Sequence, residues 1–532
     1  MQSVPNQIQR FDMPSCVHSV VSFQVFRFGF AAKLVALLAW LATTSPSTHA
    51  QDASQILALV EDATTSAIAR AEPSVVAIAR TRKERRSQDR NRLGSLRLDA
   101  PLDLHDPIQD PDFVPRFFGS GVIVSEDGFI VTCSHLLGDP KTHDYHVWLN
   151  RKHYRATVVS PPSAAAVAYA SDPFSDLAVL KIQASGLTPI EFADTNELKK
   201  GKFVIALGNP DAIARDGAAS ASWGIVSNLS RLAPARQEDE GGSKESIHRY
   251  GTLIQTDAKS TLGTSGGALI DLQGKMVGLT TSLRGRQDSE SAAGFAIATD
   301  ELFRQVLESL KKGKLPEYGF LGVQPEPIDP FDRERGIRGV RIGVVIPGLP
   351  GEQAGLEQDD IVSEVDGKPV DDRNELFREL STTMAGETVR LNVLRNAGSR
   401  SPQRLVLTAT VSKKPLSTSP RGYSIHVDGG WQGMVVDYSS AIPSELSRMG
   451  LWRHSVLAPQ IAVREVNPDT PAWNAGIRPG VGITAVNGRK VSSPAEFYAA
   501  VSKTDGSTAI ALVDTAGKAA QVSIPAPSAD SP

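Results

Sequence analysis

Short apolar runs separated by turn residues fill the chain between residues 119 and 281. Turn-forming segments such as Glu126-Asp127-Gly128 and Gly208-Asn209-Pro210 lie between the runs. Many short strands at this spacing predict an all-β barrel or sandwich. The runs that predict strands are 121–124, 128–132, 146–149, 155–159, 177–182, 203–207, 223–227 and 275–280.

Helical periodicity appears on both sides of this β-rich region. Residues 54–72 carry recurring apolar positions, and a short strand is predicted after them at 74–80. Residues 300–312 place apolar residues on one face, and Asp300 is suited to cap the N-terminus of that helix. The segment 82–116 is rich in charge, Asp and Pro, so we expect it to form a long exposed loop.

The C-terminal part of the chain contains a repeat. Ala354-Gly355-Leu356 is followed by Asp366-Gly367, and Ala475-Gly476-Ile477 is followed by Asn487-Gly488. The interval between the two glycines is 12 residues in both copies, 355 to 367 and 476 to 488. Asp-Gly and Asn-Gly are strong signals for a tight turn between strands. Self-similarity at a spacing of about 120 residues indicates two copies of one domain rather than a solenoid of small repeats.

The N-terminus has the features of an export signal. Basic residues precede an uninterrupted apolar run at 34–42, and Thr48-His49-Ala50 resembles a small-x-Ala cleavage site. Nine apolar residues are too few for a bilayer, which needs about 20. We therefore expect residues 1–50 to be a signal peptide that is removed near Ala50. A membrane anchor is the alternative, and a start at Met13 would shorten the signal to an ordinary length.

Composition and charge narrow the class of protein. The 532 residues suffice for three or four domains of about 150 residues each. A formal net charge of -3 does not favour a nucleic-acid partner. If residues 1–50 are removed, Cys133 is the one cysteine left, so no internal disulfide forms. Cys133 lies on an apolar strand and is predicted to be a small buried hydrophobe rather than a nucleophile.

Three residues that are distant in the sequence carry candidate chemistry. His135 follows an apolar strand, and Asp176 directly precedes the apolar run Leu-Ala-Val-Leu. Ser265 lies in the glycine-rich segment Gly263-Thr264-Ser265-Gly266-Gly267. The order His, Asp, Ser is that of the chymotrypsin-type serine hydrolases. A lipase or esterase of the α/β-hydrolase type is disfavoured, because its order is Ser, Asp, His.

These residue types fit the three roles that serine-based hydrolysis needs. A serine hydroxyl is a poor nucleophile at neutral pH and requires a base and an orienting carboxylate. We expect Asp176 to orient His135, His135 to take the proton of Ser265, and Ser265 to attack a carbonyl carbon. The flanking glycines let the backbone turn sharply, so the amides of Gly263 and Ser265 are expected to form the oxyanion hole.

Several segments together resemble the HtrA/Deg family of serine proteases. The two C-terminal repeats resemble PDZ domains, and the order protease, PDZ, PDZ is that of DegP-like members. The resemblance covers roughly residues 55–526. The segments that carry it in the β-rich region are 119–124 with His135, 176–182, 206–210, 254–258, 263–270 and 294–297.

The resemblance implies a multidomain, mainly β protein with a chymotrypsin-type double β-barrel. Its domains would be a signal peptide at 1–50, the protease domain at 51–313 and PDZ domains at 316–414 and 420–526. It implies an exported or periplasmic, ATP-independent endopeptidase that degrades unfolded or misfolded proteins without a metal or cofactor. The PDZ domains would bind peptide C-termini or hydrophobic segments and regulate activity. The assembly would be a homo-trimer or a larger oligomer.

The start of the first PDZ-like copy resembles the family's peptide-binding loop. Backbone amides at Phe320, Leu321, Gly322 and Val323 would hold the terminal carboxylate of a peptide that adds a strand to a sheet edge. A strand that serves packing alone is the other interpretation. The second copy, at 433–437, matches less well, so peptide binding there stays open. Packing or intersubunit contact is the alternative use of its tryptophans, which are Trp431, Trp452 and Trp473.

The sequence departs from the family pattern beside the candidate site. Cys133-Ser134 replaces the usual Asn-Asn, and Thr264 replaces the usual Asn before the nucleophile. Residues 259–262 read Lys-Ser-Thr-Leu, where the family often has Ile-Asn-Pro. Because this loop shapes the oxyanion hole, a second hypothesis is a catalytically dormant protease fold that acts as a chaperone or binding protein. The pocket at 280–294 suggests, by resemblance only, a preference for small or medium apolar side chains.

Overall fold

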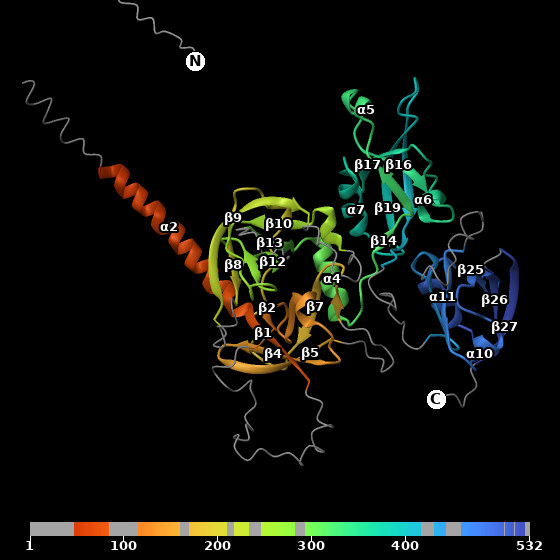
Figure 1. Cartoon of the computed structure of the whole chain (residues 1–532), viewed down its shortest axis with the longest axis horizontal. Coiled ribbons are helices and arrows are strands. Elements are labelled where there is room, and N and C mark those ends of the chain that lie inside the picture. Colours follow the sequence, from red (N-terminus) through yellow and green to blue (C-terminus); the bar gives the residue numbers. More distant parts are fainter. Residues whose placement is uncertain are drawn as a thin grey trace, which may run out of the picture. The chain divides into compact units, whose positions relative to one another are not determined.

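A computed structural model gives the fold of the chain (Figure 1). It describes residues 47–83, 115, 117–159, 170–209, 218–232, 246–281, 293–416, 430–442, 459–504, 506–514 and 517–526. The predicted loop at 82–116 therefore lies almost wholly outside the described residues. The chain divides into two units, Met1–Asp62 and Ala63–Pro532.

Helix α2, Ser47–Ala71, begins in the first unit (red in Figure 1). The prediction of a helix at 54–72 is confirmed, although the helix starts earlier, at Ser47. The short 3-10 helix η1, Glu72–Ser74, follows it. Most of the predicted signal peptide lies outside the described residues, so its removal near Ala50 stays a prediction. None of the helices in the described ranges combines the length and the apolar character needed to cross a membrane.

Six antiparallel strands of the second unit close into a first barrel. Neighbouring strands follow the order β3-β2-β1-β4-β5-β7, and pairing between β3 and β7 closes the ring. The two-residue strand β6, Ser171–Asp172, adds to β7. The barrel strands are β1 (Val75–Arg82), β2 (Phe117–Ile123), β3 (Phe129–Cys133), β4 (His143–Leu149), β5 (Lys152–Val158) and β7 (Leu177–Lys181).

A second closed barrel has the order β10-β13-β12-β11-β8-β9. The double β-barrel predicted by resemblance is thereby confirmed. Strands β10, β11 and β13, which have three to five residues, were not predicted as strands. The barrel consists of β8 (Phe203–Gly208), β9 (Ser220–Arg231), β10 (Leu253–Thr256), β11 (Ala268–Ile270), β12 (Met276–Thr281) and β13 (Gly294–Ala298). Two 3-10 helices, η3 (Thr195–Glu197) and η5 (Ile247–Tyr250), lie in its connections.

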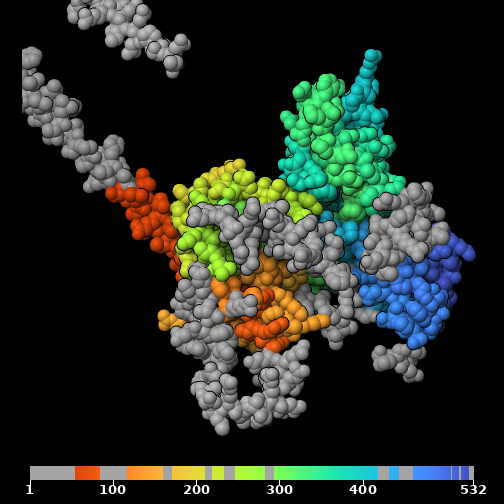
Figure 2. Space-filling view, in the orientation of Figure 1, coloured from red at the N-terminus to blue at the C-terminus, as the bar shows by residue number. Residues whose placement is uncertain are grey.

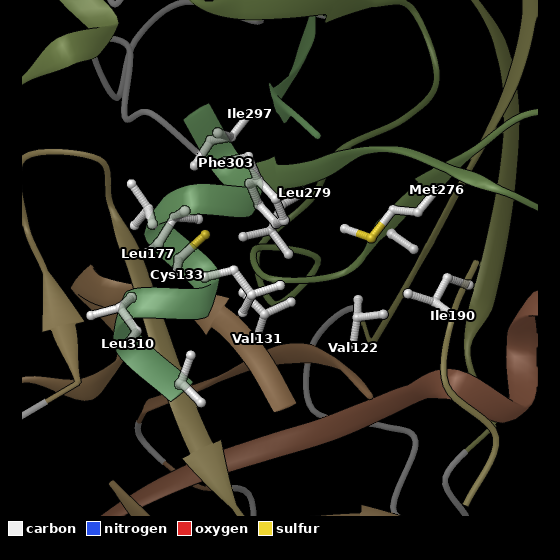
Figure 3. Packing of buried hydrophobic residues seen from close by; sticks show 14 of the residues in the cluster. Val122, Val131, Cys133, Leu177, Ile190, Met276, Leu279, Ile297, Phe303 and Leu310 are labelled. Atoms are coloured by element: carbon white, nitrogen blue, oxygen red, sulfur yellow. The ribbon is translucent and has the colours of Figure 1, made fainter. Parts of the chain in front are cut away.

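One apolar cluster joins both barrels and helix α4, Glu301–Lys311 (Figure 3). The first barrel contributes Val131 and Leu177, and the second contributes Leu279. The carboxylate of Asp300 accepts a hydrogen bond from the amide of Phe303 at 3.0 Å, which confirms the predicted N-cap. The predicted apolar face of α4 is buried, namely Leu302, Phe303, Val306, Leu307 and Leu310. Burial of this face against two barrels fixes the seam between them.

The first repeat is a five-strand path in the order β15-β16-β17-β19-β20. Its strands are β15 (Val323–Glu326), β16 (Val340–Val345), β17 (Ile361–Val365), β18 (Lys368–Pro369), β19 (Thr388–Arg395) and β20 (Gln403–Thr410). Its helices are α5 (Pro330–Glu334), α6 (Pro350–Gln353) and α7 (Arg373–Ser381). A separate pair, β14 (Gly319–Phe320) and β21 (Ser412–Lys413), brings the entry and exit of this repeat together.

The second repeat has the same topology, β22-β23-β24-β26-β27. The predicted tight turns are present in both copies, with φ of 49° at Asp366 and at Asn487 and positive φ at the glycines that follow. Each repeat has its own apolar core and forms a compact body of its own (Figure 2). Its elements are β22 (Met434–Tyr438), η6 (Ser439–Ala441), β23 (Ile461–Val466), α10 (Pro471–Asn474), β24 (Gly482–Val486), β25 (Arg489–Lys490), α11 (Pro494–Val501), β26 (Thr508–Val513) and β27 (Ala519–Ile524).

The tryptophans of the second repeat serve its packing where they are described. Trp431 and Trp473 pack against the apolar core of the repeat. Arg478 lies over the ring of Trp473, with its guanidinium carbon 3.7 Å from the ring centroid. Trp452 lies outside the described residues. Trp431 and Trp473 therefore have the packing role that was one of the alternatives for the three tryptophans.

Buried charges join the end of the first repeat to the second. The ammonium of Lys413 lies 3.1 Å from the carboxylate of Asp437 and 2.8 Å from that of Glu317. Arg464 approaches the same Asp437 carboxylate at 3.4 Å. The side chains of Lys413, Asp437 and Arg464 are between 5% and 7% exposed. Asp437 is therefore the shared counter-ion of two buried cations.

The variant Asp437→Asn is expected to lower the free energy of unfolding by about 3 kcal/mol, because it removes the shared counter-ion of two buried cations. Chemical denaturation, followed through the transition of the second repeat, measures this change. The matched control is Glu465→Gln, which removes the half-exposed carboxylate partner of Arg464 and should change stability by less than about 1 kcal/mol. Equal effects of the two variants would contradict the assignment.

Candidate active site

The closure of the first barrel brings His135 and Asp176 together. Strands β3 and β7 pair with Cys133 opposite Leu177, so the residues just beyond this pair meet at the end of the ladder. His135 lies in the short helix α3, Ser134–Leu137, which follows β3 directly. Its Nδ1 atom lies 2.9 Å from one carboxylate oxygen of Asp176 and 3.0 Å from the other. Its backbone amide also donates to the carboxylate at 3.0 Å.

Asp176 adopts an unusual backbone conformation that the surrounding contacts maintain. Its φ is 56°, in the left-handed region that non-glycine residues seldom occupy. The amide of Ser134 donates to the carbonyl of Asp176 at 2.9 Å, and the hydroxyl of Thr281 donates to its carboxylate at 3.2 Å. Burial alone would raise the pKa of Asp176, but the charge of His135 and the hydrogen bonds from it outweigh burial and lower this pKa. The carboxylate is therefore ionised beside the imidazole.

The Ser265 segment comes from the second barrel, just before β11, and is tied to the first barrel. The amide of Ser120, on β2, donates to the carbonyl of Ser265 at 2.8 Å. Gly119 lies between Ser265 and the helix that carries His135. A Cβ atom on Gly119 would lie 3.1 Å from the carbonyl oxygen of Ser265 and 2.4 Å from the side chain of Leu136. The seam between the barrels therefore holds all three predicted residues.

Gly263 occupies a position that only glycine fits. Its φ is 96°, and a Cβ atom there would lie 2.4 Å from the carbonyl oxygen of Asn209 and 2.7 Å from the ring of Phe118. Its carbonyl accepts a hydrogen bond from the hydroxyl of Ser120 at 2.8 Å. None of the described residues accepts a hydrogen bond from its amide. This geometry is compatible with an amide that points toward a ligand.

The loop at 259–264, where the sequence departs from the pattern of the family it resembles, is held by its own hydroxyls and by those of two neighbouring strands. The hydroxyl of Thr264 donates to the carbonyl of Thr261 at 2.7 Å and lies 3.1 Å from the hydroxyl of Ser260. The amide of Lys259 donates to the hydroxyl of Ser222 at 2.8 Å. Thr280 anchors the other side, because its hydroxyl donates to the carbonyl of Thr264 at 2.5 Å. Hydrogen bonds with hydroxyl groups thus hold the turn at 259–264 on both sides.

A second buried carboxylate, Asp172, supports the turn that leads to Asp176, and sequence reasoning missed it. It accepts hydrogen bonds from the amides of Phe174 and Ser175 at 3.2 and 3.1 Å and from the hydroxyl of Ser175 at 2.6 Å. A fourth bond, at 2.5 Å, comes from the hydroxyl of Tyr318. Burial raises the pKa of Asp172, although these hydrogen bonds oppose the rise. The Asp-x-x-Ser spacing was a usable signal for the turn, but no local pattern indicated Tyr318.

His248 holds the same turn from the other side. Its Nε2 atom lies 3.0 Å from the carbonyl of Ser175, and its Nδ1 atom lies 2.8 Å from the hydroxyl of Thr252. Burial lowers the pKa of His248, and the nearby Asp176 carboxylate opposes the change. The residue is completely enclosed, so we assign it a structural role in fixing the backbone before Asp176.

Cys133 is buried beneath the His135–Asp176 pair. The side chain is fully enclosed, in the cluster that contains Val131 and Leu177 (Figure 3), as predicted. Its thiol donates to the carbonyl of Thr280 at 3.5 Å. Burial, together with the charge of Asp176, raises the pKa of this thiol well above its ordinary value. A neutral, enclosed thiol is a poor nucleophile, which agrees with the predicted packing role.

The loop at the start of the first repeat exposes little side-chain surface. Leu321 and Val323 belong to the apolar core of the repeat. Gly322 has a φ of 76°, and a Cβ atom there would lie 2.4 Å from the Cβ of Leu349. Phe320 pairs with Ser412 between β14 and β21. Peptide binding by this loop stays a prediction, and it would have to use the backbone rather than the side chains of Leu321 and Val323.

Comparison with known proteins agrees with this architecture. Residues 119–279 match the family described as trypsin-like peptidase domain, and residues 319–401 and 463–513 match families described as PDZ domain. The predicted outer bounds of the domains stay predictions. Among solved structures, the chain is 25% identical to an HtrA-type protease AlgW with decapeptide, covering 66% of this chain and 99% of that one with a TM-score of 0.44.

The chain is also similar along most of its length to several bacterial proteins named probable periplasmic serine endoprotease DegP-like. The protein from Chlamydia muridarum is 30% identical over 401 residues, covering 74% of this chain and 72% of the relative. The protein from Chlamydia trachomatis is 29% identical over 418 residues, covering 77% and 75%. The protein from Brucella suis is 28% identical over 397 residues, covering 73% and 69%. With its trypsin-like peptidase domain and two PDZ domains, the chain belongs to the DegP-like family of serine endoproteases.

Proposed function

We propose that this protein is an exported, ATP-independent endopeptidase that degrades unfolded or misfolded polypeptides with a His135–Asp176–Ser265 triad. The observation that supports the triad best is the hydrogen bond between His135 and Asp176 at the barrel seam, beside the Ser265 segment. The sequence features of the N-terminus and the periplasmic names of the relatives support an exported location. No ATP or metal is needed in this scheme, because an activated hydroxyl and a water molecule complete the reaction.

The chemistry follows from the tautomer that the carboxylate selects. The ionised Asp176 accepts the Nδ1–H of His135, so the lone pair of Nε2 is free to take the proton of Ser265. The alkoxide that forms attacks the peptide carbonyl, and the imidazolium then gives its proton to the leaving amine. Water repeats the sequence and releases the acyl group. Asp176 stabilises the imidazolium in both halves without becoming protonated.

Backbone amides of Gly263 and Ser265 would stabilise the charge that develops on the carbonyl oxygen. One such donor contributes about 3 to 4 kcal/mol of transition-state stabilisation. The positive φ of Gly263 and the absence of room for a Cβ atom support this role. The departures at 259–264 favour the second candidate function, a dormant protease fold that acts as a chaperone or binding protein, since these residues shape the same turn.

The PDZ domains would capture exposed chain ends or hydrophobic segments and regulate the protease. The first domain offers a glycine at 322 with positive φ, next to a strand that could pair with an added peptide. Tyr318, at the entry to that domain, donates to Asp172 below the catalytic turn. Changes at the entry of the PDZ domain therefore have a short path to Asp176. We further propose a homo-trimer or a larger oligomer, which the family resemblance supports.

The variant Ser265→Ala should lower the rate of casein cleavage by at least about 10⁴-fold while the thermal unfolding profile is unchanged, because it removes the nucleophile alone. Labelling of the wild-type protein by a fluorophosphonate probe at Ser265 checks the same residue directly. Unchanged proteolysis in the variant would refute the triad. A wild-type protein that is neither labelled nor active, yet prevents aggregation of an unfolded protein, would support the dormant fold.

The variant Gly263→Ala should lower kcat by about 10² to 10³-fold, since the added methyl group has no space and must displace the oxyanion amide. Steady-state kinetics with a chromogenic peptide measures kcat and KM separately. The control is Gly201→Ala, where φ is similarly positive, at 87°, but no atom lies within 4 Å of the added Cβ. Similar losses of kcat in the two variants would show that backbone strain, rather than the oxyanion site, is responsible.

The variant Tyr318→Phe should lower kcat several-fold with little change in KM, because Asp172 loses one of four donors and the turn before Asp176 is less firmly held. Kinetics and thermal unfolding of the same preparation separate the two effects. Tyr498→Phe is the matched control, since its hydroxyl accepts a hydrogen bond from the amide of Val436 within the second PDZ domain, at 3.0 Å. If both variants lose stability alike and neither changes kcat, Tyr318 is a structural residue only.

A further inference from the structure

Cys133, His135 and Asp176 form a cluster of three metal-ligating side chains. The Cys133 sulfur, a ring nitrogen of His135 and a carboxylate oxygen of Asp176 all lie within 4.8 Å of one another. Within the part of the chain that the structure describes, this is the one group of three or more His, Cys, Asp or Glu side chains close enough to hold an ion. The proposed hydrolysis uses the histidine and the aspartate and gives no role to the sulfur.

We propose that this cluster binds a thiophilic divalent cation, Zn²⁺ or Cd²⁺, and that the bound cation inhibits hydrolysis. Thiolate, imidazole and carboxylate are the ligands that zinc takes in proteins, and a three-ligand site leaves one position for water. Mg²⁺ and Ca²⁺ prefer oxygen ligands and are not expected to bind. The inhibitory part of this proposal rests on the proposed function, whereas the binding part does not.

The geometry needs only a local adjustment. Ligand atoms around tetrahedral zinc lie about 3.3 to 3.7 Å apart, given metal–ligand distances of about 2.0 to 2.3 Å. The Nδ1 atom of His135 and the carboxylate of Asp176 are already 2.9 Å apart, so they must separate slightly. The sulfur lies within 4.8 Å of these two atoms, so it must approach them by about 1 Å to reach a tetrahedral spacing. Metal binding therefore requires rotations of these three side chains.

The proton balance explains why binding would abolish activity. The cation replaces the thiol proton of Cys133, which leaves for solvent, and it takes the lone pair of Nδ1 on His135. The neutral ring keeps one proton, which must now reside on Nε2. In the active tautomer, Nε2 is the atom that accepts the proton of Ser265. A metallated His135 therefore cannot act as the base, although its position hardly changes.

The burial of Cys133 determines how a cation can reach the cluster and which thiol reagents cannot reach it. The Cys133 side chain is fully enclosed, whereas the His135 side chain is 35% exposed. A cation therefore has to enter past the imidazole, so inhibition should develop slowly after mixing. Large thiol reagents have no such route, and the neutral thiol is a poor nucleophile toward them. These features separate metal binding from covalent modification of the cysteine.

A pair of imidazoles elsewhere in the first barrel could bind the same cations, so the experiment needs a control for it. The Nδ1 atom of His146 lies 2.9 Å from the Nε2 atom of His153, on paired strands of the first barrel. The two rings are stacked, with centroids 5.1 Å apart. Zinc inhibition alone would therefore not identify the site. The variant His153→Gln removes this alternative and leaves the Cys133 cluster intact.

The binding test uses full-length protein with Ser265→Ala and Cys16→Ser, so that Cys133 is the single thiol and no activity is needed. Titration with Cd²⁺ should produce an ultraviolet thiolate-to-metal charge-transfer band that saturates at one ion per chain. Adding Cys133→Ser should abolish the band, and adding His135→Ala should weaken binding at least about 10-fold. The His135→Ala variant decides the question if Cys133→Ser does not fold. Absence of the band would overturn the proposal.

The activity test compares Zn²⁺ inhibition of casein cleavage in three proteins that retain Ser265. In wild type and in His153→Gln, half-inhibition should occur at the same Zn²⁺ concentration, and a chelator should restore activity. The rates of Cys133→Ser are normalised to its own metal-free rate. Its half-inhibitory Zn²⁺ concentration should be at least about 10-fold higher than that of the wild type. Equal inhibition of all three proteins would overturn the inhibitory role. A cadmium band in the Ser265→Ala protein, combined with no proteolytic activity of the wild type, would support the metal site and refute the proposed function instead.

Discussion

The pairing of strand β3 with strand β7 is the interaction on which the rest of the site depends. Closing the first barrel sets Cys133 opposite Leu177, and this register places His135 and Asp176 at one end of the ladder. A shift by one residue would reverse the faces of the side chains and separate the two. The buried cluster between the barrels then holds the Ser265 segment against the same edge. The site is therefore a consequence of barrel closure and of apolar packing across the seam.

Two buried carboxylates, four residues apart in the chain, have different electrostatic environments. Asp176 faces an imidazole and has a lowered pKa, whereas Asp172 faces hydroxyls and amides and has a raised pKa. Neutral donors stabilise a buried carboxylate less than a neighbouring cation does. This difference fits an ionised group that orients the base and a structural group that anchors the turn. The left-handed backbone at Asp176 is maintained because both neighbours of the turn are fixed.

Two glycines mark the places where we propose that backbone amides meet a ligand. Gly263 and Gly322 both have positive φ and both lack space for a Cβ atom, and each lies where an amide is expected to meet a ligand. The two PDZ domains share one strand order, yet among the described residues it is the first that supports the turn before Asp176, through Tyr318. Similar folds thus make different connections to the protease domain.

Local patterns in the sequence determined the elements and the candidate chemistry. Short apolar runs predicted most strands of the two barrels, the apolar face of 300–312 predicted α4, and Asp-Gly and Asn-Gly predicted the turns of both repeats. The order of His135, Asp176 and Ser265 indicated a serine hydrolase, because residue order and neighbouring glycines are visible without a fold. The contacts of Asp172 with Tyr318, of His248 with Ser175 and of Cys133 with its neighbours were decided by tertiary structure alone. Their partners lie far apart in the chain or on different elements, and long-range contacts depend on strand register and barrel closure, which no local pattern encodes.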